Sequence, residues 1–136
     1  MLTAPSSLGI IFFPAFDWAI SPTHPEREER LLYTQDQFRE EGLFDIKGIS
    51  EHRPLRAEDV DILRTHFCFP SVAEVCTESH RISAGGAIRA AQLVLEQESK
   101  RAFALVRPPG HHAMKVVHGN RGFCNINIEA VMVEWI

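Results

Sequence analysis

Residues 102–113 have the sequence AFALVRPPGHHA, in which an apolar run changes abruptly into two prolines, a glycine and two adjacent histidines. We expect residues 102–106 to form a buried strand, which the prolines end because proline cannot donate a hydrogen bond to a β-ladder. The stretch from 107 to 124 is then a loop. A second apolar run, at 8–13, is typical of a strand buried on both faces, as in a parallel sheet.

Helices are expected between and after these strands. The predicted helices are 25–41, 57–67, 83–97 and 126–136, and a further short strand is predicted over 45–50. In 57–67 the apolar residues Val60, Leu63 and Phe67 lie on one side, and in 83–97 two adjacent glycines are expected to allow close packing. Strands that alternate with helices indicate an α/β fold with a parallel sheet.

Composition favours one ordinary globular domain over residues 1–136. The chain is 45% hydrophobic with a formal net charge of −4, and no apolar stretch reaches the roughly 20 residues that span a bilayer. The three cysteines, Cys68, Cys76 and Cys124, form no CxxC pair, so we expect reduced thiols in a cytoplasmic protein. The absence of a basic cluster in the sequence argues against a nucleic-acid partner.

His111 and His112 are the residues that carry chemistry. They follow a predicted buried strand, and α/β proteins bind ligands at the carboxyl ends of such strands. In a regular strand the two side chains would point to opposite faces, so only an irregular backbone brings both to one site. Amide hydrolysis needs one proton taken from water and another given to the leaving amine, and imidazole can do either. The plainer alternative is two solvated loop histidines.

A family resemblance supports the chemical interpretation. Residues 107–113, with Gly122-Phe123-Cys124 and Asn127 downstream, resemble the signature of the histone deacetylase and acetylpolyamine amidohydrolase superfamily. His24-Pro25-Glu26-Arg27 is similar to an early segment of that family, and the likeness runs from about residue 8 to 136. It implies the N-terminal part of an arginase/deacetylase-like fold: a three-layer, partial parallel sheet with strand order 2-1-3, flanked by helices.

The same resemblance implies roles for particular residues. In such enzymes a zinc ion binds the acyl carbonyl and a water molecule while a histidine pair manages the protons, which makes His111 and His112 the catalytic residues here. Phe123 would wall the channel for the acylated lysine or polyamine arm, and Gly122 would present its backbone to the substrate amide. The family's zinc ligands lie in later segments. We therefore expect no metal ligand in residues 1–136, no zinc bound by this chain alone and no activity without the complete domain.

Two alternatives remain open. The first is a non-catalytic assembly or partner-binding module, in which the open edge of the strand at 102–106 drives self-association. The second is a small zinc site made by His111, His112, His118 and Cys124, although that spacing matches no common structural zinc pattern. Otherwise Cys124 is expected to be a buried support of the loop, His118 an exposed loop residue and His24 a helix-start residue.

Overall fold

The sheet has three parallel strands in the order β2-β1-β3. The strands are β1 (Thr3–Phe12), β2 (Lys47–His52) and β3 (Arg101–Leu105). The computed structural model describes residues 1–14, 23–24, 27, 29–67, 69, 71–115 and 123–136. The observed order confirms the predicted order 2-1-3.

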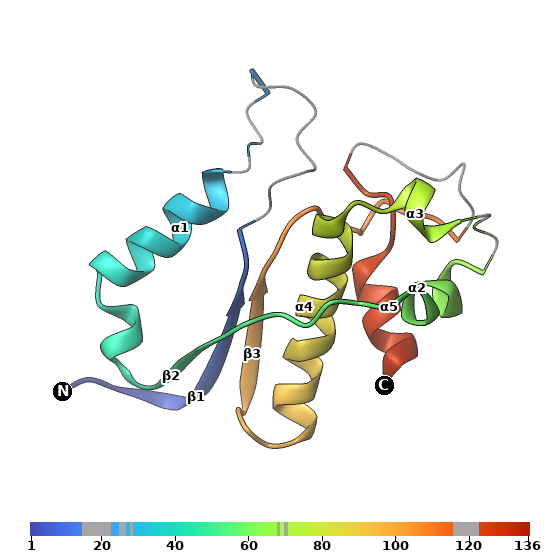
Figure 1. Cartoon of the computed structure of the whole chain (residues 1–136). Helices are drawn as coiled ribbons and strands as arrows, with labels where there is room; N and C mark the ends of the chain where they lie inside the picture. The colour runs from blue at the N-terminus through green and yellow to red at the C-terminus, as the bar shows by residue number, and fades with distance from the viewer. Residues whose placement is uncertain (15–22, 25–26, 28, 68, 70, 116–122) are drawn as a thin grey trace.

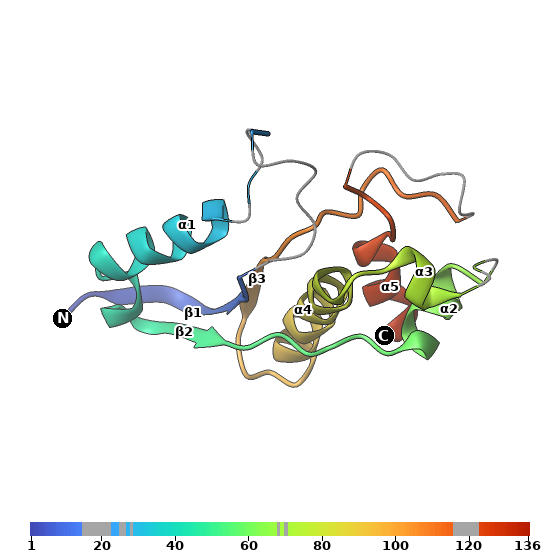
Figure 2. The ribbon, with the colours of Figure 1, turned by 45° about the horizontal axis from the view of Figure 1, so that its top comes forward.

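Helices cover both faces of this sheet. They are α1 (Glu29–Glu40), α2 (Asp59–Thr65), α3 (Val72–Val75), α4 (Glu78–Leu95) and α5 (Ile128–Trp135), with a 3-10 turn η1 at Leu43–Asp45. Figure 1 shows α1 on one side of the strands and α4 on the other, with α5 and α2 beyond α4. The turned view in Figure 2 keeps α1 and α4 apart in the same way, which confirms the three-layer arrangement.

The central strand β1 is buried on both faces, as its apolar run predicts. A Cβ added to Gly9 would lie 2.6 Å from Leu93 of α4, so this face of β1 meets α4. On the opposite face Phe12 clusters with Leu31 of α1. Since successive strand residues alternate between faces, a strand covered on both sides needs a continuous apolar run.

The predicted burial of β3 is only partly correct. Phe103, in the middle of the strand, is 51% exposed. Its face is the one that α1 covers over β1 and β2, where Arg39 of α1 binds Glu51 of β2 at 2.6 Å. Because α1 is tied to β2, on the far side of β1, it does not extend over the whole of β3. The apolar composition of residues 102–106 predicted the strand. The position of β3 at the edge of the sheet decided how exposed its side chains are.

Helix boundaries differ from the predicted ones where caps were not recognised. Helix α4 begins at Glu78, five residues earlier than predicted, because Thr77 and His80 cap each other reciprocally. The backbone N–H of Thr77 donates to Nδ1 of His80 at 3.2 Å. The usual capping box has Glu or Gln in the position of His80, so the sequence did not indicate that a helix begins here. Helix α1 ends at Glu40, within a residue of the predicted end, and Gly42 follows with φ +68°.

The predicted apolar side of the helix at 57–67 is wrong in part. Ile62 is the fully buried residue of α2, whereas Val60 is 57% exposed and Phe67 is 61% exposed. Helix α2 ends at Thr65, so Phe67 lies beyond it. A seven-residue helix is too short for its periodicity to identify the buried side, and the helices that pack against it decide this instead.

The two glycines of α4 allow the close packing that was predicted. A Cβ on Gly85 would overlap the backbone carbonyl of Leu55, and one on Gly86 would lie 2.7 Å from Val106. Helix α4 therefore sits directly on the strand that leads to the histidines. No helix in the described part of the chain is both long enough and apolar enough to cross a bilayer.

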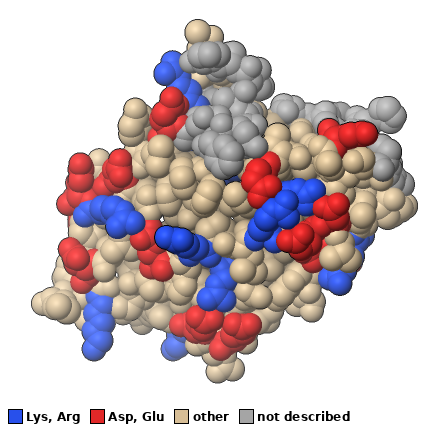
Figure 3. All heavy atoms as spheres, viewed as in Figure 1, with Lys and Arg blue, Asp and Glu red and all other residues tan. Residues whose placement is uncertain are grey.

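Charged side chains of both signs are interspersed on the face shown in Figure 3. Ion pairs at the surface of the described part of the chain include Arg56 with Glu78 at 2.7 Å and Arg89 with Glu98 at 3.2 Å. Exposed pairs of this kind contribute little stability, about 0 to 1 kcal/mol each. Their effect is to leave this face without a block of a single sign.

Candidate active site

His111 and His112 occupy the two central positions of a tight turn that follows β3. The N–H of Ala113 donates to the carbonyl oxygen of Gly110 at 3.0 Å, which closes the turn. The two imidazole rings have centroids 4.1 Å apart with an interplanar angle of 51°. Both side chains are exposed. The irregular backbone that the sequence required is therefore present, and it brings the neighbouring rings together, while their catalytic role stays a prediction.

At Gly110 the turn lies in close contact with the segment that leads into α5. A Cβ at this position would overlap the backbone nitrogen of Ile128 and would lie 2.6 Å from the carbonyl oxygen of Ile126. Both are main-chain atoms, which cannot move aside as the end of a side chain can. Glycine is thus required here for a close approach of two backbones.

The chain before the turn is anchored to α4. Pro108 is fully buried, and its carbonyl oxygen accepts a hydrogen bond from Oγ of Ser83 at 2.7 Å. The peptide bond between Arg107 and Pro108 is cis. Ser83 is itself fully buried on α4, so this hydrogen bond links the turn to the interior of the molecule.

Asn127 connects the turn to α5. Its Oδ1 accepts from the N–H of Ala130 at 2.9 Å and caps the helix, while its Nδ2 lies 3.5 Å from the carbonyl oxygen of Ala113. The backbone N–H of Asn127 donates to Nε2 of His66 at 2.9 Å. One residue therefore meets the turn, the helix and a buried histidine.

His66 is fully buried at the end of α2, and its role was missed from the sequence. Its ring stacks on Phe69 with centroids 4.7 Å apart, and its Nδ1 lies 3.4 Å from the carbonyl oxygen of Lys115. Burial lowers the pKa of His66, against an opposing effect of the backbone carbonyls of Lys115 and Met114. The ring is therefore neutral at pH 7, with Nε2 as acceptor and the proton on Nδ1.

Phe123 lies at the carboxyl ends of β1 and β3. It packs against the cluster of Phe12 and Leu31, together with Leu105. The His24 ring meets it edge-on, with centroids 5.4 Å apart, and the Arg107 guanidinium lies 5.9 Å from its ring centre. His24 was expected to start a helix, in a loop that the resemblance places near the mouth of the site. The contact of its ring with Phe123 was not itself predicted. Gly122 lies outside the described residues.

The cysteines near the turn are structural. Cys124 is 1% exposed, which confirms the predicted buried support of the loop. Cys76 is also buried, and burial raises the pKa of its thiol to about 11, so it is a neutral thiol at pH 7. Both are free thiols. Cys68 and His118 lie outside the described residues, as does part of the four-residue zinc site considered above.

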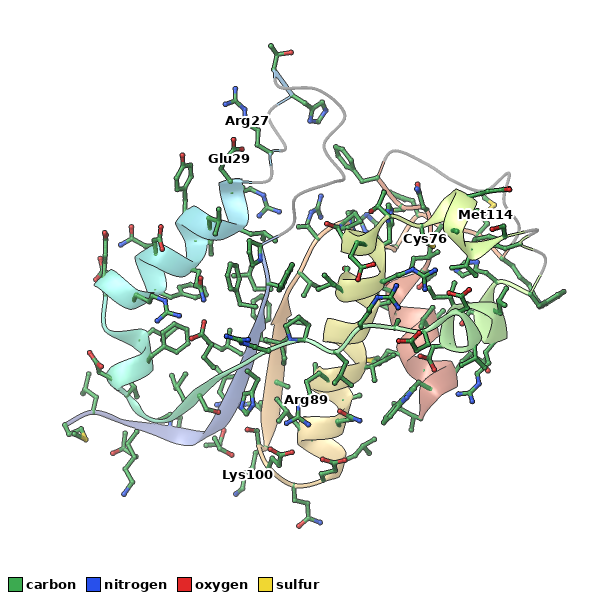
Figure 4. The ribbon with its side chains drawn as sticks, viewed as in Figure 1. Arg27, Glu29, Cys76, Arg89, Lys100 and Met114 are labelled. Carbon is green, nitrogen blue, oxygen red and sulfur yellow. The ribbon has the colours of Figure 1, made fainter. Side chains whose placement is uncertain are left out.

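A cleft of about 310 Å³ lies between the turn, the end of α2 and α5. Its lining includes His66, Ala113, Met114, Lys115 and Asn127. Figure 4 shows Met114 on the side of the molecule where α2 and α3 lie, far from Arg27 and Glu29 at the start of α1. Met114 and Lys115, directly after the histidine turn, thus lie near the end of α2, and Cys76 lies among the neighbouring helices.

Comparison with known proteins agrees with this architecture. A sequence profile of the histone deacetylase domain matches residues 63–136. A probable deacetylase of Archaeoglobus fulgidus is 43% identical in the aligned region, which covers 85% of this chain and 37% of that protein. A histone deacetylase-like amidohydrolase of Pseudomonas aeruginosa is 32% identical in the aligned region, which covers 81% of this chain and 32% of that protein.

The crystal structure of the HDA15 HD domain is similar to this chain in fold. It superposes with a TM-score of 0.70 at 24% sequence identity, covering 94% of this chain and 42% of that one. The chain thus spans well under half the length of these relatives.

Proposed function

Because this chain belongs to the histone deacetylase family, we propose that it forms part of a zinc-dependent deacetylase. The substrate class is an acylated amine, such as acetyl-lysine or an acetylpolyamine. The observation that carries the proposal is the paired imidazoles of His111 and His112, 4.1 Å apart on a turn after β3. That turn lies where α/β proteins place their ligands.

The two rings are suited to the two proton transfers of amide hydrolysis. One neutral imidazole takes a proton from water as the water oxygen bonds to the acyl carbon. The C–N bond then breaks, and the second ring, in its cationic form, gives a proton to the leaving nitrogen. The products are a carboxylic acid and a free amine. With centroids 4.1 Å apart, both rings can reach a single amide group.

Zinc, when bound in such an enzyme, polarises the acyl carbonyl and lowers the pKa of its water to about 7. The described residues do not fit a zinc site by themselves, since no group of three His, Cys, Asp or Glu side chains among them could hold a metal ion. We therefore expect the 136-residue polypeptide alone to bind no stoichiometric zinc and to show no deacetylation. Zinc-dependent deacetylation by the purified chain would contradict this.

Phe123 is the proposed wall of the substrate channel. Its ring is half-buried and held by two neighbours, His24 at its edge and Arg107 near its face. An aromatic ring fixed in this way suits an aliphatic lysine or polyamine arm. Gly122, the next residue toward the turn, keeps its proposed role of offering its backbone to the substrate amide.

A chimera tests the proposal. Residues 1–136 would replace the aligned stretch of the Archaeoglobus fulgidus relative, to which they are 43% identical. We expect the chimera to bind zinc and to release acetate from an acetyl-lysine peptide or an acetylpolyamine. Substitution of both His111 and His112 by alanine should lower kcat by about 100-fold or more, because general acid–base catalysis contributes about that much.

Met114→Ala is the matched control, because Met114 is a half-exposed neighbour of the turn without a proton to transfer. It should leave kcat within about twofold, as is usual for surface substitutions. A folded, zinc-loaded chimera without activity would overturn the proposal. So would full activity of the double histidine variant.

A second candidate function, assembly, rests on β3. Within the described residues this strand pairs with β1 alone, and Phe103 in the middle of the strand is 51% exposed. An unpaired strand edge with exposed apolar side chains is an association site. We propose that isolated chains self-associate there, which sedimentation at increasing concentration would reveal. A clean monomer at high concentration would count against it.

The cytosol is the proposed compartment. The buried Cys76 and Cys124 are free thiols, in keeping with a reducing environment. We propose neither a nucleic acid nor a membrane as partner, since Lys and Arg are outnumbered by Asp and Glu, 14 against 18.

A further inference from the structure

We propose that His66 is a positioning residue, whose buried imidazole acts through Asn127 to hold the turn that pairs His111 with His112. Its meaning for catalysis rests on the proposed function, whereas the geometric effect can be measured on this chain alone. His66 lies 61 residues before Asn127, so the effect would join the end of α2 to the start of α5.

The first step is the hydrogen bond between His66 and Asn127. The donor is a backbone N–H and the acceptor is Nε2 of a fully buried ring, at 2.9 Å. This N–H precedes the first turn of α5, where no helical carbonyl is available to accept it. Without the imidazole, the amide would lose its acceptor in a part-buried setting, which is unfavourable.

The second step leads from Asn127 to the turn. Its Nδ2 lies 3.5 Å from the carbonyl oxygen of Ala113, a long contact whose length depends on where the Asn127 backbone sits. The N–H of the same Ala113 closes the turn on Gly110. A shift of Asn127 would therefore reach the residue that defines the spacing of the two exposed imidazoles.

The third step concerns the other side of the His66 ring. Phe69 stacks on it with an interplanar angle of 16°, and Nδ1 lies 3.4 Å from the carbonyl oxygen of Lys115, two residues after the turn. The ring is thus fixed in both orientation and tautomer. It contacts two residues that line the cleft, Asn127 and Lys115.

The cleft explains why one side chain has this influence. About 310 Å³ of space borders Ala113, Met114 and Lys115, so on this side the turn is not supported by close packing. Met114 is 50% exposed and Lys115 is exposed as well. On this side, residues 113–115 are held by polar contacts from His66 and Asn127 rather than by packed side chains.

The test uses NMR spectroscopy of the chain with three variants. The readouts are the cross-relaxation between ring protons of His111 and His112, and hydrogen exchange of the Asn127 amide. His66→Leu keeps bulk but removes both ring nitrogens; we expect the inter-ring signal to fall at least about twofold and exchange to quicken about tenfold. His66→Gln, whose Oε1 can accept from Asn127, should restore most of both.

Ile62→Ala is the control for stability alone, because Ile62 is fully buried one turn earlier on α2 and its apolar side chain cannot form a hydrogen bond with Asn127 or the turn. It should destabilise the chain while it keeps the inter-ring signal. If His66→Leu does not fold, Asn127→Asp takes its place as the test variant. It keeps the cap of α5 but loses the contact between Nδ2 and the carbonyl oxygen of Ala113.

Unchanged ring proximity and Asn127 protection in the His66→Leu chain would overturn the proposal. Where Asn127→Asp decides, unchanged ring proximity alone would overturn it, because that variant keeps the backbone hydrogen bond from residue 127 to His66. An equal loss of the inter-ring signal in Ile62→Ala would do the same. Since no readout is deacetylation, such a failure leaves the proposed function intact. Conversely, an inactive chimera with the expected ring signals would reject the function and not the positioning.

Discussion

The hydrophobic clusters on the two sides of the sheet differ in size. The two parts of the candidate site, the histidine turn and Phe123, are attached to different clusters. On the α4 side, one cluster holds ten of the described buried residues and continues through α2 and α5. On the α1 side the cluster consists of Phe12 and Leu31, joined by Leu105 and Phe123. The histidine turn is anchored to the first cluster and Phe123 to the second.

This difference indicates where the site is rigid and where it can adjust. Ser83, Gly110 and Asn127 hold the turn against well-packed helices, and local opening is rare where buried contacts are dense. Phe123 has a thinner support, including two contacts from His24 and Arg107. The histidine turn is thus expected to be preorganised, and the surroundings of Phe123 to be softer.

The largest effect is expected from truncation in the larger core. Ile126→Ala should lower the free energy of unfolding by about 4 to 5 kcal/mol and Leu31→Ala by about 2 to 3 kcal/mol. Both residues are almost fully buried, but the smaller cluster around Leu31 can relax more easily. Guanidinium denaturation would measure both values. An equal or larger loss in Leu31→Ala would remove the proposed asymmetry.

Gly110→Ala should cost about 1 to 3 kcal/mol of unfolding free energy and separate the paired rings, because the new methyl group meets backbone atoms. The matched variant is Gly86→Ala, whose methyl group meets the end of the Val106 side chain. That side chain can move, and alanine favours the helix by about 1 kcal/mol. The Gly86 variant should therefore be clearly milder in thermal unfolding, and equal losses would contradict the close-approach argument.

An intermediate effect is expected from pH. Burial lowers the pKa of folded His66 below its ordinary value of 6.5, so the unfolded chain binds this proton first as the pH falls. The stability that neutral His66 contributes is complete above about pH 6.5 and is lost as the pH falls through the folded pKa. Besides the backbone carbonyls it meets, the charged neighbours along the cleft are Arg64, Lys115 and Glu134.

The measurement is the free energy of unfolding at about pH 7.5 and about pH 5.5, for the unmodified chain and His66→Gln. The other six histidines are common to both proteins, so the informative quantity is the difference between the two slopes. We expect the unmodified chain to lose more stability. Identical slopes would show that His66 is not held neutral by the fold.

The smallest effect on stability is expected at the sheet edge. Phe103→Lys replaces a half-exposed ring, so the free energy of unfolding should change by no more than about 0.5 kcal/mol. Self-association should nevertheless fall, because a charge at an open edge opposes strand pairing. Sedimentation would measure the fall in self-association. Val133→Lys is the control for added charge, because Val133 on α5 is 61% exposed. An equal drop in both would locate the association elsewhere.

Local patterns in the sequence predicted all three strands to within a few residues, except for the exposed start of β1 at Thr3, where the residues are more polar. They also predicted that His111 and His112 lie together, since the prolines and Gly110 leave no regular alternative. The sequence did not predict the cap at Thr77 and His80 or the short helix α3, because neither has a long apolar period. The catalytic and substrate-binding roles of the four site residues stay predictions.

The sequence by itself determined the parallel sheet and the irregular loop that holds the two histidines, because both follow from neighbouring residues and their spacing. Only the tertiary structure decided that His66 is buried against Asn127, that His24 meets Phe123 and that Phe103 is exposed. These facts join segments tens of residues apart or depend on which strand lies at an edge. A single sequence contains no local signal for such contacts, since they depend on how the helices and strands pack.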